Sequence, residues 1–142
     1  MKIYLTTLGS RGDNEPFRAL ATEAAKRGHE VHFAHTHDLP FDEGAGYTEW
    51  ELPGSIEKWV AESGVSVIKA LRDYKEHLGP MQQAILRASE EQIRHLRPDV
   101  VVYHSKVQTA PVVAHEVGAL AVLAEMMPIM TPTSEFATGA IS

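Results

Sequence analysis

Strand-like and helix-like segments alternate along the chain, and this alternation is the feature that most constrains its fold. Residues 3–7 are apolar and β-prone, residues 16–27 place apolar side chains at helical spacing, and residues 30–34 again favour a strand. One helix joined to two strands by short connections is typical of a βαβ unit, whose strands run parallel. The first part of the chain therefore predicts a parallel α/β sheet.

The alternation continues toward the C-terminus. Residues 99–103 begin with Asp99 and continue as an apolar, β-branched run, which is typical of a central strand covered on both faces. Helical patterns at 80–96 and 110–117 flank this run, and strands are expected at 47–52 and 120–123. Because crossover connections between parallel strands are right-handed, we expect helices on both faces of the sheet.

The composition excludes several classes of protein. A chain of 142 residues with 44% hydrophobic and 23% charged residues is expected to form one globular domain. Its net charge of −6 and scattered basic residues argue against a nucleic acid partner. It contains no cysteine, which excludes disulfides and thiolate metal sites, and no stretch approaches the ~20 apolar residues of a spanning helix. We expect a soluble, cytoplasmic protein without a transmembrane segment.

Ligands of open parallel sheets bind beyond the carboxyl ends of the strands. Three segments follow predicted strands there, at residues 8–15, 104–108 and 125–134, and we expect them to line one edge of the molecule. The first contains Gly9-x-x-Gly12-Asp13, where glycines after a strand allow backbone N–H groups to face a ligand. It matches neither the dinucleotide fingerprint nor the P-loop.

Each of these features also has a purely structural interpretation. Asp13 is a favoured residue for capping a helix that begins at Pro16, and Arg11 either holds a phosphate or pairs with Asp13 or Glu15. His104 either contacts a ligand or is simply solvated. Apolar side chains at helical spacing either line an acceptor pocket or fill the core; they are Trp59, Ile68, Leu71, Tyr74 and Met81.

A longer stretch of the sequence resembles a known family. Residues 7–17, together with 27–31, resemble the opening of bacterial antibiotic and sterol glycosyltransferases that have two Rossmann domains. The resemblance continues through 97–102, 114–119 and 128–136, and it is to the N-terminal half of those enzymes. It implies a Rossmann-like sheet that forms one half of a GT-B architecture.

In that family the N-terminal domain binds the acceptor, and the C-terminal domain binds most of the nucleotide-sugar. The resemblance implies that residues 1–142 are the acceptor-binding domain and that the C-terminal domain is absent from this chain. The implied reaction is an inverting, metal-independent transfer of a hexose from a UDP- or dTDP-sugar co-substrate, with no tightly bound cofactor. The acceptor would be a hydroxyl on a small apolar natural product, sterol or lipid, and the isolated chain would be inactive.

The resemblance assigns the catalytic base to Asp13, which would take the proton of the acceptor hydroxyl. Asn14 departs from the family pattern, which more often has an apolar residue there. Substrate contacts are expected in the three edge segments, and the candidates are Gly9, Ser10, Arg11, Gly12, His104, Ser105, Met126, Met127 and Thr131.

The histidines at 32, 35 and 37 do not favour a metal site, because alternation along a strand separates His32 from the other two. A different function also fits the pattern. The same strand-edge crevice could belong to a non-catalytic α/β module that binds a nucleotide or another small molecule.

Overall fold

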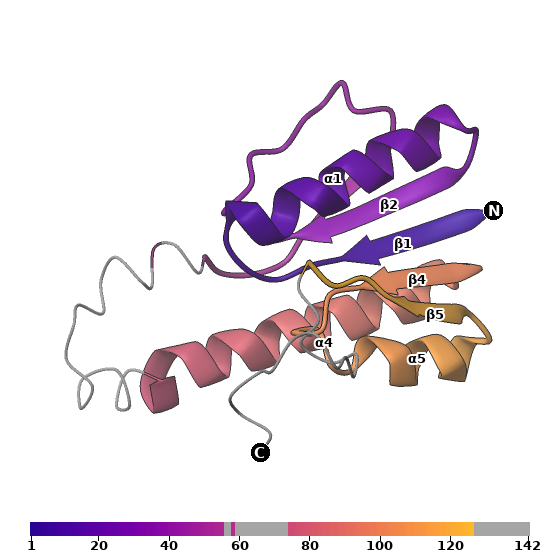
Figure 1. Cartoon of the computed structure of the whole chain (residues 1–142). Helices are drawn as coiled ribbons and strands as arrows, with labels where there is room; N and C mark the ends of the chain where they lie inside the picture. The colour runs from indigo at the N-terminus through magenta and orange to yellow at the C-terminus, as the bar shows by residue number, and fades with distance from the viewer. Residues whose placement is uncertain (56–57, 59–73, 127–142) are drawn as a thin grey trace, which may run out of the picture.

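The computed structural model describes residues 1–55, 58 and 74–126. Within this part of the chain, the strands form one parallel sheet in the order β3-β2-β1-β4-β5. Figure 1 labels four of them, β2, β1, β4 and β5. The strands are β1 (Lys2–Thr6), β2 (Glu30–His35), β3 (Thr48–Glu51), β4 (Val100–Tyr103) and β5 (Leu120–Leu123). The parallel α/β sheet expected from the sequence is confirmed.

Strand β1 lies in the middle of the sheet, paired with β2 on one side and β4 on the other. Its side chains alternate between two separate cores, because successive residues of a strand point to opposite faces. Tyr4 packs in the core that contains residues of α4 (Gly79–Leu96) and α5 (Ala110–Val117), whereas Ile3 and Leu5 pack in the core that contains residues of α1 (Arg11–Lys26). The β-branched strand at 99–103 lies inside the sheet as expected, but β1 rather than β4 occupies its centre.

Helices cover both faces of the sheet, as expected from right-handed crossovers (Figure 1). Helix α1 (Arg11–Lys26) covers one face, and α4 (Gly79–Leu96) with α5 (Ala110–Val117) covers the other. A short π-helical segment, η1 (Tyr74–Leu78), leads directly into α4. None of the helices in the described ranges is long and apolar enough to cross a membrane.

Helix α1 begins at Arg11, and the expectation that it begins at Pro16 is wrong. Ser10 is the N-cap, and a capping box joins it to Asp13, whose carboxylate accepts the backbone N–H of Ser10. This local start signal outweighs Pro16, which is accommodated in the second turn of the helix. The segment that connects β1 to α1 is therefore only four residues long, from Thr7 to Ser10.

Several predicted segments lie outside the described residues. They include most of the helix expected after Ser55, the helical pattern around residues 67–73, and the final segment from residue 127 onward. At the described end of this region, Ser55 Oγ accepts the backbone N–H of Lys58 at 3.1 Å, a contact of the kind that an N-cap serine makes.

Candidate functional site

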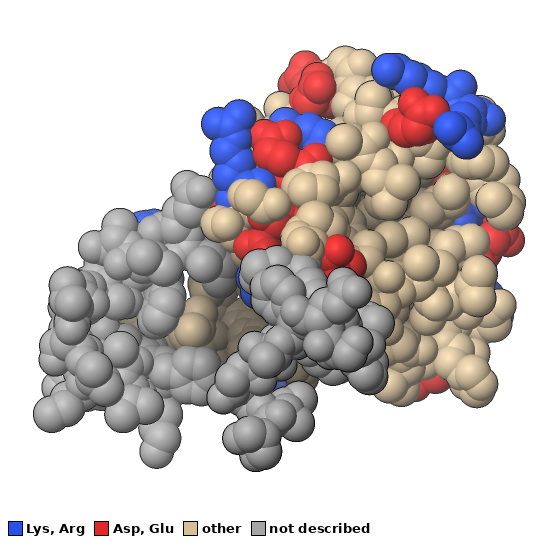
Figure 2. Space-filling model, in the orientation of Figure 1, with Lys and Arg blue, Asp and Glu red and all other residues tan. Residues whose placement is uncertain are grey.

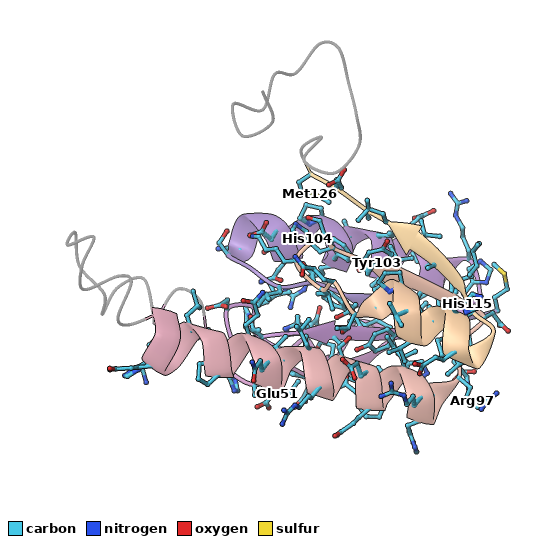
Figure 3. All side chains as sticks on the ribbon, turned by 90° about the horizontal axis from the view of Figure 1, so that it is seen from below. Glu51, Arg97, Tyr103, His104, His115 and Met126 are labelled. Carbon is cyan, nitrogen blue, oxygen red and sulfur yellow. The ribbon has the colours of Figure 1, made fainter. Side chains whose placement is uncertain are left out.

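Two segments that are far apart in the sequence meet at the carboxyl edge of the sheet. Asp13 Oδ1 lies 3.2 Å from Lys106 Nζ and 3.4 Å from His104 Nε2, so the segments after β1 and β4 lie side by side as expected. Of the third expected segment, the structure describes Glu125 and Met126. Figure 3 shows His104 and Met126 at one end of the sheet, whereas Arg97 and His115 lie at the opposite end.

The two oxygens of Asp13 have different surroundings. Oδ2 accepts the backbone N–H of Ser10 at 2.8 Å and lies 3.2 Å from its hydroxyl, which completes the capping box. Oδ1 faces Lys106 and His104 instead. The interpretation of Asp13 as the cap of a helix that begins at Pro16 is wrong in its position: Ser10 is the N-cap, and Asp13 is the third residue of the helix that begins at Arg11, where it completes the capping box. One oxygen holds the helix start, and the other is directed toward the segment after β4.

Gly9 is required by this arrangement. Its φ is +153°, which residues with a side chain rarely adopt, and a Cβ at this position would lie 2.0 Å from Asp13 Oδ2. The buried Asn14 adds a second tie between the loop and α1, because its Nδ2 donates to the Gly9 carbonyl at 3.1 Å. An apolar residue at position 14 could not make this bond, so the departure from the family pattern has a local structural role.

His104 is buried and its protonation is controlled by its neighbours. Its Nδ1 accepts the backbone N–H of Lys106 at 3.1 Å, so a single ring proton must reside on Nε2, the nitrogen that faces Asp13. Burial and the Lys106 charge lower the pKa of His104, and the opposing effects of Asp13 and Glu125 are smaller. At neutral pH the ring is therefore neutral and presents an N–H toward Asp13 Oδ1.

A cavity of about 180 Å³ has two neighbours of Asp13, Gly9 and Lys106, in its described lining. It opens between the loop after β1 and the beginning of α4, and its described lining consists of Leu8, Gly9, Leu78, Met81, Gln82, Ile85 and Lys106. Gly9 and Lys106 both lie against Asp13, which places the carboxylate next to the cavity. The lining is mostly apolar, and an apolar cavity of about 150 Å³ can hold one benzene ring.

The structure assigns each of the other candidates a position. Arg11 forms an exposed ion pair with Glu15 at 2.9 Å, one of the two partners considered for it. Gly12 lies in the first turn of α1, Ser105 is half-buried beside His104, and Met126 is exposed. Met127 and Thr131 lie outside the described residues.

Lys106 lies in the edge segment 104–108 that the sequence indicates, but nothing in the sequence marks its side chain as a partner of Asp13, and Gln82 of α4 carries no clear signal. The position of Lys106 two residues after His104 is a weak indication, because many loops contain an exposed lysine. The functional interest of Lys106 comes from its contact with Asp13, which is 93 positions away in the sequence. Met81, in contrast, was correctly expected to be either pocket or core, and it contributes to both.

A second polar cluster lies on the other half of the sheet. His35 is fully buried, its Nδ1 donates to the Thr36 carbonyl at 2.9 Å, and its Nε2 faces Glu49 Oε1 at 3.2 Å. Arg18 of α1 lies 3.5 Å from the same carboxylate, and the backbone N–H of Asp42 donates to its second oxygen at 2.6 Å. This cluster joins α1, β2 and β3.

Surface charge and titratable clusters give little sign of other ligands. Acidic and basic side chains intermingle over the described part of the face seen in Figure 2, without a basic patch. Among residues 1–55, 58 and 74–126, no group of three or more His, Asp or Glu side chains is arranged to hold a metal ion.

The sequence of this chain is similar to parts of known glycosyltransferases. No family model matches the chain. It is 36% identical over 89 residues to the O-mycaminosyltylonolide 6-deoxyallosyltransferase of Streptomyces fradiae, a match that covers 62% of the chain and 19% of that protein. It is 28% identical over 110 residues to the sterol 3-beta-glucosyltransferase of Saccharomyces cerevisiae, covering 71% of the chain and 9% of that protein.

Solved structures agree on the fold. The calicheamicin glycosyltransferase CalG4 matches 87% of the chain with a TM-score of 0.67 and 22% identity, and SnogD from Streptomyces nogalater matches 90% with a TM-score of 0.64 and 21% identity. The chain spans 32% and 34% of these two proteins. The chain is thus similar in sequence to antibiotic and sterol glycosyltransferases, and it has the α/β fold found in one part of the GT-B glycosyltransferases.

Proposed function

We propose that this chain is the N-terminal, acceptor-binding domain of an inverting hexosyltransferase whose second domain binds a nucleotide-sugar. The observation that carries the proposal is the position of Asp13: its carboxylate is fixed at the ligand edge of the sheet, with Oδ1 directed away from the helix cap and beside an apolar cavity. The similarity to glycosyltransferases gives this carboxylate a reaction in which a base is needed.

In the proposed reaction Asp13 Oδ1 takes the proton of the acceptor hydroxyl as the hydroxyl oxygen attacks the anomeric carbon of the sugar. The bond from that carbon to the diphosphate breaks, and its electron pair leaves with the nucleoside diphosphate. A single displacement inverts the anomeric centre. Because Oδ2 is held by the Ser10 backbone N–H, the carboxylate keeps its orientation while Oδ1 reacts.

The donor is proposed to be a UDP- or dTDP-hexose, bound as a co-substrate. Two structural neighbours were solved with thymidine diphosphate (dTDP), which supports this class of donor. The acceptor is proposed to be a small apolar natural product, sterol or lipid with a free hydroxyl. The apolar lining of the cavity supports an acceptor with at least one hydrophobic ring.

The test is Asp13→Asn in the full-length protein. An asparagine oxygen still accepts the Ser10 N–H and preserves the cap, whereas the basic oxygen is lost, so kcat should fall by roughly 10²-fold or more. Glu15→Gln is the matched control, since it removes a neighbouring carboxylate that pairs with Arg11 on the surface. Thermal melts of both variants check the fold. Near-wild-type turnover of Asp13→Asn would leave Asp13 as a helix cap only.

The isolated chain is expected to transfer no sugar. Without the proposed second domain, the diphosphate is not positioned or stabilised as a leaving group, and the roughly 7–11 kcal/mol available from orientation is largely lost. A transfer assay on the isolated chain, combined with calorimetric titration with nucleotide-sugars, tests this expectation. Micromolar donor binding would instead favour the nucleotide-binding module and would move the donor site to the loop after β1.

A further inference from the structure

Lys106 differs from every other described residue that lines the cavity, because it alone among them carries a charge. Its two ends have different environments. The backbone N–H donates to the buried ring of His104, which fixes the base of the side chain. The side chain is about half exposed, and its Nζ lies 3.2 Å from Asp13 Oδ1. The charge is therefore held at the border between the cavity and the carboxylate.

The contact between Lys106 and Asp13 can be interrupted by a ligand. Exposed ion pairs contribute little to stability, and this pair uses Oδ1, the oxygen that the helix cap leaves available. At 3.2 Å the two groups are in direct contact, so a hydroxyl group binds between them only when Lys106 Nζ moves away from Asp13 Oδ1. It can then bridge the two charges, because a hydroxyl both donates and accepts hydrogen bonds. It would donate to Asp13 Oδ1 and accept from Lys106 Nζ, while the ring that bears it occupies the apolar cavity.

We propose that Lys106 is a catalytic residue that contacts the acceptor oxygen, an inference that rests on the proposed function. The acceptor proton passes to Asp13 Oδ1, a bond forms from the acceptor oxygen to the anomeric carbon, and the bond from that carbon to the diphosphate breaks with its electron pair. Lys106 keeps its protons throughout. Its ammonium group stabilises the negative charge that develops on the acceptor oxygen before the new bond is complete.

A purely structural role for Lys106 predicts the opposite sign. If the ammonium group only neutralised Asp13, its removal would leave a more available carboxylate, and turnover of Lys106→Met would equal or exceed that of the wild type. If the ammonium group stabilises the acceptor oxygen, Lys106→Met lowers kcat by about 10²- to 10³-fold, as for other groups that stabilise an oxyanion. The loss should be larger for an alkyl alcohol than for a more acidic phenol.

Hydroxyl binding is tested first, on the isolated chain and without a sugar donor. Titrations with p-cresol and toluene compare the same ring with and without a hydroxyl, in the wild type, in Lys106→Met and in Lys26→Met, which removes an exposed charge at the far end of α1. We expect the ratio of p-cresol to toluene affinity to fall about fivefold or more in Lys106→Met and to stay unchanged in Lys26→Met. An unchanged ratio in Lys106→Met, or no binding of either probe to the wild type, would overturn the inference.

Turnover of the full-length protein separates the two proposals. Transfer by the wild type together with wild-type turnover by Lys106→Met would refute the catalytic role of Lys106 and leave the proposed function standing. Absence of transfer by the wild type, with a p-cresol preference that depends on Lys106, would refute the proposed function and leave Lys106 as a ligand-binding residue only. The inference is supported if Lys106→Met loses both the hydroxyl preference and turnover while Lys26→Met keeps both.

Discussion

Replacement of Gly9 by alanine should destabilise the protein by disrupting the start of α1. The added Cβ would lie 2.0 Å from Oδ2, 2.4 Å from Cγ and 2.8 Å from Cβ of Asp13, all below the distance that real side chains show. Either the Gly9 backbone or the Asp13 side chain must move. Because Asp13 Oδ2 accepts the Ser10 N–H, movement of its side chain also breaks the capping box.

The magnitude follows from two contributions. A residue with a side chain at φ +153° costs about 1–3 kcal/mol of backbone strain, and loss of the cap costs about 1 kcal/mol, so Gly9→Ala should lower the free energy of unfolding by about 2–4 kcal/mol. Two controls isolate the causes. Gly28 has φ +83°, and a Cβ added there would meet no atom within 4 Å, so Gly28→Ala measures strain alone. Gly12→Ala, in the first turn of α1, should be neutral or stabilising.

Urea denaturation followed by far-UV circular dichroism measures these differences. Asp13→Ala tests the mechanism, because it removes the two nearest of the three clashing atoms and leaves the Cβ. Its cost should be about 1 kcal/mol or more smaller in the Gly9→Ala background than in the wild type. Strict additivity of the two substitutions, or a Gly9→Ala variant no less stable than Gly28→Ala, would refute the steric argument.

Three further predictions concern burial, charge and folding. Glu49→Leu should destabilise by about 3–5 kcal/mol in urea denaturation, because the replaced carboxylate is only 6% exposed and its loss leaves the buried His35 and the partly buried Arg18 without this partner. Glu51→Leu on the same strand replaces a side chain that is 57% exposed, so it should change stability by less than about 1 kcal/mol. In NMR titrations Lys106→Met should raise the pKa of His104, and Asp13→Asn should lower it. The pKa of His104 is lower in the folded state than the value of about 6.5 in the unfolded chain. The contribution of His104 to stability is therefore present above about pH 6.5 and is lost as the pH falls through the folded-state pKa. The isolated chain should fold cooperatively on its own, and a broad melt without fixed tertiary signals would contradict this.

The sequence determined the order and type of the described elements because these depend on local periodicity. Apolar spacing predicted the βαβ unit at the N-terminus, the strand at 99–103 and the helix at 110–117, which the structure confirms with small changes of boundary. The predicted start of α1 is five residues too late, because Pro16 is typical of a first helical turn, whereas the helix starts at the capping pair of Ser10 and Asp13. The resemblance to glycosyltransferases assigned Asp13 a catalytic role, which stays a prediction, and the structure places Asp13 at the carboxyl edge of the sheet beside His104 and Lys106.

Only the tertiary structure decided which side chains meet. The sheet order places β1 next to β4, although the two strands are separated by most of the described chain, and this neighbourhood brings Lys106 and His104 to Asp13. The same is true of the buried cluster of His35, Glu49 and Arg18, which combines three elements. Periodicity specifies the hydrogen bonds within a helix or strand and the face that it buries, whereas contacts between distant side chains depend on the packing of all elements together.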